Sequence, residues 1–264
     1  MYQKLDLSDV SWSKNDIKNA IKLPTHLTED LSHFLGIHYG DGYMKVQKRS
    51  KRIDYRLIYS GHSINEQDWY ENYISHLIKR LFNKDVVPRK TVKNTIRIYF
   101  CSKAIIEFLN KACEVPYSPK INIKIPSIVL ESEEFCIKSA FLRGLADTDF
   151  SLVFKGKCKK YSNHKPTIDH KTSDIRLHED IKKLLSDLDF NFCSGRTKNF
   201  RKGKAHDSYY IQINGKENLK KWMKNIGFSS SNHLTKYEVW KKYGFLVPKT
   251  DIHRRKSLLK IFEP

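Results

Sequence analysis

The 264-residue sequence predicts an α+β protein made of two pseudo-symmetric halves. The first observation is a repeat: segments 34–42 and 141–149 are both apolar, have helical spacing and carry an aspartate near their end. The second is that helical and strand-like periodicities follow each copy in the same order. Each half therefore reads as helix, hairpin, helix, hairpin, helix.

The first half begins with the repeated helix. Thr25 or Thr28 suits its N-cap, because a hydroxyl oxygen there accepts a backbone hydrogen bond and acidic residues follow in the first turn. After Asp41 the polarity alternates at every second residue, which predicts a strand. The further elements predicted are a strand at about 54–60, a helix at 67–82, a hairpin at about 86–100 turning at 93–94, and a helix capped by Ser102.

The second half repeats this order. Its predicted elements are a strand from Asp149 to about 160, a partner at about 165–170, a helix at about 177–188, a hairpin through 202–203 and a helix at about 218–226. Prolines and a basic cluster indicate a linker between the halves. The predicted division is an N-terminal extension (1–24), a first subdomain (25–115), a linker (116–130), a second subdomain (131–234) and a basic C-terminal helix and tail (235–264).

Charge indicates the class of partner. The chain holds 49 lysines and arginines against 29 acidic residues, a formal net charge of +20 that is spread along its length. No apolar stretch has the length of a membrane-spanning helix and no signal peptide is evident, so we expect nucleic acid and not a membrane. The five cysteines form no CxxC pair, which favours a reducing compartment. We expect a cytoplasmic, prokaryotic-type location.

The aspartates that end the repeated helices predict a metal site. A carboxylate at a helix C-terminus is disfavoured by up to about 1 kcal/mol, and a divalent cation compensates for this. If the two helices pack side by side and parallel, Asp41 and Asp149 meet at one point. We therefore expect Mg²⁺ there, with Gly40 and Thr148 as the neighbouring metal-binding positions.

Small residues in the repeated helices predict their close approach. Gly36 and Gly40 lie one turn apart, and each costs about 1 kcal/mol relative to alanine in a helix. Gly144 and Thr148 supply matching small residues in the second copy. His38, within the first copy, is expected on the helix surface and not as a metal ligand.

Cationic and polar side chains follow one face of several predicted strands. A charged strand face is usually only the solvated side of an antiparallel sheet. Several such strands beside two acidic helix ends instead predict a surface for the major groove of double-stranded DNA. The predicted DNA-binding residues are Lys45, Gln47, Arg49, Lys93, Arg97, Lys155, Lys157, Lys159, Tyr210 and Gln212.

The repeated segments resemble the LAGLIDADG motif of homing endonucleases. The resemblance runs from about residue 23 to 245 and includes segment 119–126, which resembles archaeal-type members. It implies a monomer with two motif helices between two αββαββα subdomains, whose antiparallel sheets bind DNA. It also implies magnesium-dependent cleavage of both strands across the minor groove, with two or three divalent ions shared between the acidic residues.

The resemblance assigns roles to residues of this chain. Asp41 and Asp149 match the metal-binding acids, whereas Asp147 is matched by Tyr39 in the first copy and is taken as structural. The family also places a lysine near the end of each half. Lys120 matches it in the first half, with Lys124 as the neighbouring candidate. In the second half Asn232 stands in its place and Lys236 is a candidate substitute, so the two sites are expected to differ in activity.

The leading functional hypothesis is a sequence-specific homing endonuclease that makes a staggered double-strand cut in a long pseudo-palindromic target by metal-dependent phosphodiester hydrolysis. One alternative is an RNA maturase that assists splicing of its host intron RNA; another is a noncatalytic DNA-binding regulator on the same fold. The presence of both acids argues against the regulator and leaves the maturase open. Because the chain starts with Met1 and lacks a terminal His-Asn, we expect an intron-encoded or free-standing enzyme and not an intein.

Overall fold

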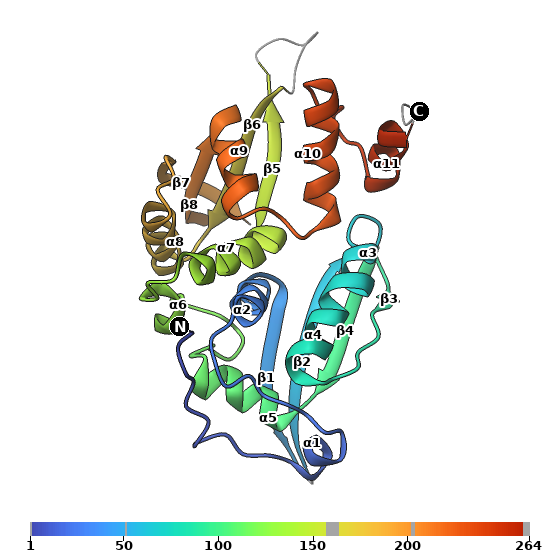
Figure 1. Ribbon diagram of the computed structural model, residues 1–264, viewed down its shortest axis with the longest axis vertical. Coiled ribbons are helices and arrows are strands. Elements are labelled where there is room, and N and C mark those ends of the chain that lie inside the picture. Colours follow the sequence, from blue (N-terminus) through green and yellow to red (C-terminus); the bar gives the residue numbers. More distant parts are fainter. Residues whose placement is uncertain (1, 51, 157–163, 202–203, 261–264) are drawn as a thin grey trace.

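The computed structural model describes residues 2–50, 52–156, 164–201 and 204–260. Two halves with the same order of elements lie against each other, and the repeated helices α2 (Glu29–Asp41) and α7 (Phe135–Asp149) lie between them (Figure 1). Each half carries one four-stranded antiparallel sheet. The predicted α+β architecture of two similar halves is confirmed.

The first half contains the sheet with strand order β1-β2-β4-β3. Two π-helical turns, Tyr70–Ile74 and Phe108–Ala112, continue short α-helices, so the helix predicted at 67–82 is one helical stretch in three parts. In addition to α2, the elements are α1 (Lys14–Lys18), β1 (Gly42–Arg49), β2 (Arg52–His62), α3 (Gln67–Trp69), α4 (Ser75–Phe82), β3 (Arg89–Thr91), β4 (Thr95–Cys101) and α5 (Lys103–Glu107).

The second half contains the sheet with strand order β5-β6-β8-β7. Helices α10 and α11 follow α9 at the end of this half, and α11 lies at the periphery in Figure 1. In addition to α7, the elements are α6 (Ser127–Leu130), β5 (Phe150–Lys155), β6 (Lys165–Thr172), α8 (Ile175–Asp187), β7 (Cys193–Arg201), β8 (Lys204–Asn214), α9 (Lys216–Asn225), α10 (Ser231–Tyr243) and α11 (Ile252–Lys260).

Capping and turn residues act as the sequence predicts, with one correction. The side chain of Thr28 accepts a hydrogen bond from the Leu31 backbone, and that of Ser102 caps α5 in the same way. Lys93 and Asn94 adopt positive φ angles of 59° and 55° and form the turn between β3 and β4. The prediction that Lys93 belongs to a strand face is therefore wrong: it lies in the turn, because β4 begins at Thr95.

Each sheet buries one face under helices and leaves the other open. In β4, Ile96, Ile98 and Phe100 are buried, whereas the intervening Arg97 and Tyr99 are exposed. Helix α5 lies against β2 in the first half, and α8 and α9 lie against β8 in the second. This alternation is typical of an antiparallel sheet with one solvated face.

The two central helices are apolar around most of their circumference because both halves cover them. Leu31, Phe34 and Leu35 of α2 are fully buried, as are Phe141 and Leu142 of α7. A helix that is hydrophobic on all sides belongs either in a protein core or in a membrane. Within the described ranges no helix is both long and apolar enough to cross a membrane.

Candidate active site

The two central helices pack backbone against backbone. A methyl group on Gly36 would clash with the carbonyl oxygen of Phe141 and lie 2.8 Å from the amide nitrogen of Leu145. In the same way, a methyl group on Gly144 would lie 2.7 Å from the amide nitrogen of Ile37. Real methyl carbons do not approach backbone atoms so closely. The predicted close, parallel packing of the two helices is therefore present.

The C-terminal ends of both helices meet. A methyl group on Gly40 would clash with the side chain of Thr148 and lie 3.3 Å from the carboxyl carbon of Asp149. Asp41 directly follows Gly40, and the negative charge of Asp149 acts on its carboxylate, so the two carboxylates lie near each other. They stand where α2 passes into β1 and α7 into β5. Asp41 is half-buried and Asp149 is more exposed.

The surroundings of the two aspartates disfavour their charged forms. Burial raises the pKa of Asp41 to about 7, and the negative charges of Glu66 and Asp149 add to this effect. Displacement of water also raises the pKa of Asp149, against the opposing effect of Lys120. The Tyr70 hydroxyl donates a hydrogen bond of 3.1 Å to Asp41 Oδ2. Two adjacent carboxylates with raised pKa values form a site that a cation would stabilise.

The donors at this point fit a divalent metal ion that prefers oxygen. The carboxylates of Asp41 and Asp149 are hard oxygen ligands. Among the described residues no group of three or more His, Cys, Asp or Glu side chains forms a closed metal site. Such an open site leaves coordination positions for water and phosphate oxygen atoms.

Lys120 lies at this end of α2. Its Nζ donates hydrogen bonds to the carbonyl oxygens of His38 at 2.8 Å, Tyr39 at 2.6 Å and Gly40 at 3.3 Å. These carbonyl groups belong to the last turn of α2, where a cation is favoured; the His38 carbonyl also accepts from the backbone amide of Gly42. Burial lowers the pKa of Lys120 to about 8, while the two aspartates, Asp149 first, oppose this shift. Lys120 is thus the cation whose charge reaches both aspartates.

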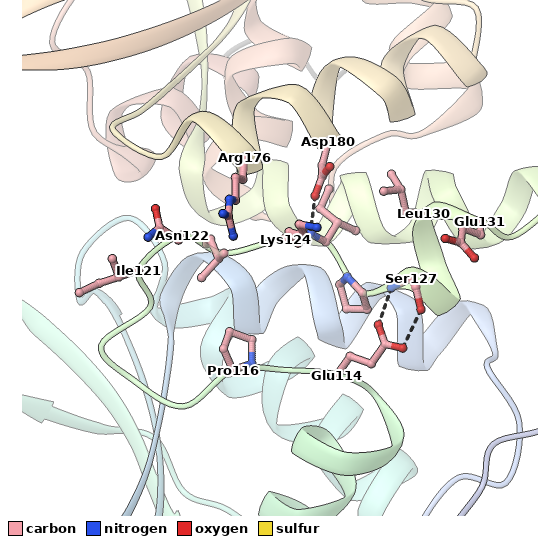
Figure 2. A pocket seen from close by; sticks show the side chains of 13 residues that line it. Glu114, Pro116, Ile121, Asn122, Lys124, Ser127, Leu130, Glu131, Arg176 and Asp180 are labelled. Carbon is pink, nitrogen blue, oxygen red and sulfur yellow. Dashed lines mark hydrogen bonds between the residues drawn. The ribbon is translucent and has the colours of Figure 1, made fainter.

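Lys124 lies in a different place. Figure 2 shows it among the residues lining a cavity of about 410 Å³ beside the linker, near Asp180 and Arg176. Its carbonyl oxygen accepts a hydrogen bond from the Tyr39 hydroxyl, whereas its side chain interacts electrostatically with Asp180. Of the two lysines predicted for the first half, the geometry favours Lys120.

The cavity in Figure 2 is bounded by a firmly held linker. The backbone amide of Ile125 donates to Asp180, and Glu114 accepts from both the amide and the hydroxyl of Ser127. Asp174, the N-cap residue of α8, accepts from the amide of Ile123. These contacts fix the segment that carries Lys120.

Asp147 is a structural residue, as the sequence comparison of the two copies indicates. Its buried carboxylate accepts hydrogen bonds from the amides of Ser229 and Ser230 at 2.9 Å each and lies 3.3 Å from His33 Nε2. Its counterpart Tyr39 holds the linker at Lys124. This position of each motif copy therefore anchors the segment that follows its own half.

Asn232 and Lys236 lie one turn apart on α10. Asn232 Oδ1 accepts a hydrogen bond of 2.7 Å from Arg255 Nη2 of α11. Burial lowers the pKa of Lys236 to about 8, Arg255 lowers it further, and Glu66 opposes this. Glu66 also raises the pKa of Asp41, so the charge of this glutamate acts on both Lys236 and Asp41.

Three residues near the site were not found from the sequence. Tyr70, Glu66 and Arg255 come from a π-helical turn, the N-cap of α3 and the C-terminal helix. None lies in a repeated motif, and each reaches the site through tertiary packing. The one local signal is that Glu66 is a polar residue just before a predicted helix, and this is the ordinary signal of a helix start.

The expected surface position of His38 is wrong. His38 is fully buried, and its Nδ1 lies 2.8 Å from the Tyr59 hydroxyl oxygen. Burial and the charge of Lys120 lower the pKa of His38 to about 3, so the imidazole is neutral. The packing of α2 against β2 causes this, because the helix has no solvent-exposed side at this point.

The open face of the first sheet is basic. Lys45 of β1 lies opposite Arg56 of β2, and Arg97 of β4 lies opposite Arg89 of β3. Arg49 and Arg56 both pair with Asp54, at 2.8 Å each. The predicted residues Lys45, Gln47, Arg49 and Arg97 share this face, and Arg56 and Arg89 extend it beyond the prediction.

The open face of the second sheet is more mixed in its described part. Lys155 lies opposite Lys165, and Gln212 donates a hydrogen bond of 2.8 Å to Asp169. Tyr210 lies opposite Lys171, and its phenol group packs over Gly195. The predicted DNA-binding residues Lys157 and Lys159 lie outside the described residues.

Comparison with known proteins agrees with this geometry. Residues 137–227 match the model of a LAGLIDADG-like domain. The chain is also 26% identical over 239 residues to the replication factor C small subunit of Methanocaldococcus jannaschii, covering 86% of the chain and only 12% of that protein.

Two solved structures share the fold. The homing endonuclease I-DmoI in complex with DNA and Mn is 15% identical, with a TM-score of 0.53, and the match covers 76% of this chain and 97% of that one. The LAGLIDADG homing endonuclease I-LtrWI bound to target DNA is 11% identical, with a TM-score of 0.54, and the match covers 83% and 90%. The likeness is one of fold, and it confirms the resemblance read from the two motif copies.

Proposed function

We propose that this chain, which has a LAGLIDADG-like domain and the fold of LAGLIDADG homing endonucleases, is a sequence-specific endonuclease that makes a staggered double-strand cut in a long pseudo-palindromic DNA target. The observation that carries the proposal is the meeting of Asp41 and Asp149 at the ends of two closely packed helices. A noncatalytic regulator has no use for two adjacent carboxylates that repel each other.

The proposed reaction is metal-dependent phosphodiester hydrolysis. Asp41 and Asp149, with the carbonyl groups of Gly40 and Thr148, would hold divalent ions such as Mg²⁺, which activate water and neutralise phosphate charge when bound. Lys120, fixed at the end of α2, stabilises negative charge that develops beside Asp149. The Tyr70 hydroxyl orients the Asp41 carboxylate.

The two open sheet faces are proposed to bind the DNA on either side of the aspartates. Arginine and lysine side chains contact phosphates and guanine, whereas glutamine and asparagine suit adenine. The two sheets differ in the residues that they present, so the two half-sites of the target differ. We propose that the chain is divided into the subdomains that its sequence predicts. One monomer acts on one target.

The proposal is tested with a plasmid library that carries randomised inserts. The purified protein is incubated with this library in Mg²⁺, in Ca²⁺ and in EDTA, and new DNA ends are sequenced. We expect staggered ends at one family of sequences, in Mg²⁺ only. Binding of the same sequences without new ends in Mg²⁺ would instead support the regulator, and would overturn the endonuclease.

We propose no replication activity for this chain, because its match to the replication factor C small subunit covers only 12% of that protein. The maturase alternative is tested by measuring the splicing rate of the host intron RNA with and without the protein. Faster splicing in the presence of the protein would add this function, and it would leave the cleavage test unaffected.

A further inference from the structure

The C-terminal helix α11 connects the two halves. The backbone amide of Ile252 donates a hydrogen bond of 3.0 Å to Asn65 Oδ1, between β2 and α3. Lys256 Nζ lies 3.6 Å from Asp68 Oδ2 of α3. On the other side, the Tyr243 hydroxyl of α10 donates to the carbonyl oxygen of Leu258. Helix α11 is thus attached to both halves.

This attachment buries Arg255, which is only 2% exposed. Its guanidinium donates to Asn232 Oδ1 at 2.7 Å and to the Thr250 carbonyl oxygen at 3.3 Å. Its Nε has no hydrogen-bond partner among the described residues. Asp251 compensates its positive charge only in part, because burial still lowers the pKa of Arg255 to about 10. A buried arginine whose hydrogen bonds go to an amide and a carbonyl group is costly for stability alone.

The contact determines which way the Asn232 amide faces. A guanidinium only donates hydrogen bonds, so the amide oxygen must face Arg255. The NH₂ group of Asn232 is then turned away from Arg255. In the first half, the predicted counterpart of Asn232 is a lysine, which also only donates.

Lys236 lies one turn further along α10, and the charge of the same guanidinium acts on it. The charged and titratable groups that face it are Arg255 from α11, Glu66 from the segment before α3 and His233 from its own helix. Arg255 therefore acts on both residues that are candidates to replace the missing lysine.

We propose that Arg255 is a positioning residue of the second active site, which turns the Asn232 amide donors and the Lys236 ammonium group towards the phosphate of one DNA strand. The proposal rests on the proposed function. Helix α11 then belongs to the catalytic unit, because it positions Asn232 and Lys236, which no residue of the two motif copies does.

The test compares Arg255→Met with Arg254→Met, an equal change at the neighbouring exposed position. The substrate is the target recovered from the randomised library, labelled differently on each strand, and single-turnover rates are measured for each strand in Mg²⁺. We expect Arg255→Met to slow one strand by at least about tenfold, the effect of losing an oriented charged donor, and to leave the other strand within about twofold. Arg254→Met should leave both rates unchanged, and Arg255→Lys should restore most of the cleavage rate.

Two further measurements separate positioning from folding. Asn232→Asp keeps a partner for Arg255 but removes the amide donors, so it should slow the same strand without lowering the melting temperature. In NMR titrations with ¹³Cε-lysine, assigned with Lys236→Arg, the pKa of Lys236 should rise towards the ordinary 10.5 in Arg255→Met, because a neighbouring cation is removed.

Equal slowing of both strands by Arg255→Met, or no slowing, would overturn the proposal. If the wild-type protein cuts no DNA, the proposed function fails. The NMR comparison still decides the part of Arg255 in that case, since an unchanged Lys236 titration would show that Arg255 does not act on it.

Discussion

Gly144→Ala tests the packing that brings the aspartates together. The added methyl group would clash with the carbonyl oxygen of His33 and lie 2.7 Å from the amide nitrogen of Ile37. Ordinary contacts of such a carbon are about 3.5–4.0 Å long, so the helices must part by about 1 Å. Overpacking of this kind costs about 1–3 kcal/mol, and the better helix propensity of alanine returns about 1 kcal/mol. We expect a net loss of up to about 2 kcal/mol, which lowers Tm by up to about 8 °C.

The larger effect is expected in cleavage. A displacement of about 1 Å between reacting groups lowers a rate by about 100-fold, while the sheets that bind DNA stay intact. The assay is single-turnover cleavage in Mg²⁺ beside DNA binding in Ca²⁺. Gly244→Ala is the control: its φ of 76° strains an alanine, but no atom lies within 4 Å of the methyl position and the aspartates are not affected. A Gly144→Ala protein that cuts at the wild-type rate would refute the packing argument.

Three other predictions follow from charge and burial. Burial lowers the pKa of His38 and His233 to about 3, below the ordinary 6.5. The unfolded state therefore takes up protons at a higher pH than the folded state. The free energy of unfolding has its full value above pH 6.5 and falls below it by up to about 1.4 kcal/mol per pH unit for each histidine. Urea unfolding with equal midpoints at pH 7 and pH 5 would contradict this. Replacing Lys45 and Arg97 with alanine should lower the salt dependence of binding by about 0.9 in logarithmic slope for each phosphate interaction removed, and an unchanged slope would assign both to solvent. Lys120→Met should slow one strand and lengthen the life of a nicked plasmid intermediate, whereas equal slowing of both strands would refute the asymmetry.

Local patterns account for most of the fold. The glycines of the two motif copies predicted the close helices, and the caps at Thr28 and Ser102 and the turn at 93–94 follow from turn and helix chemistry. The alternation of polar and apolar residues predicted the strands. It also extended a strand face through Lys93, because the alternation in a short hairpin continues into its turn. A period describes which residues share a face, not where the hydrogen-bonded ladder ends.

The candidate site was predictable only where it coincides with the repeat. Asp41 and Asp149 lie in the motif copies, whereas the choice between Lys120 and Lys124 depends on an irregular linker that has no periodicity. His38 was misplaced because its burial depends on Tyr59, a residue on a different element. Arg255 reaches the site by docking of a helix that has no counterpart in the first half, so neither spacing nor repeat indicates it.

The most direct test of the central claim is strand cleavage by Asp41→Asn and Asp149→Asn on the target recovered from the library. Each change removes one metal-binding charge and leaves the basic sheets in place, so we expect wild-type DNA binding in Ca²⁺ and no double-strand cut in Mg²⁺. If either single variant cuts both strands at the wild-type rate in Mg²⁺, the paired aspartates are not the catalytic centre.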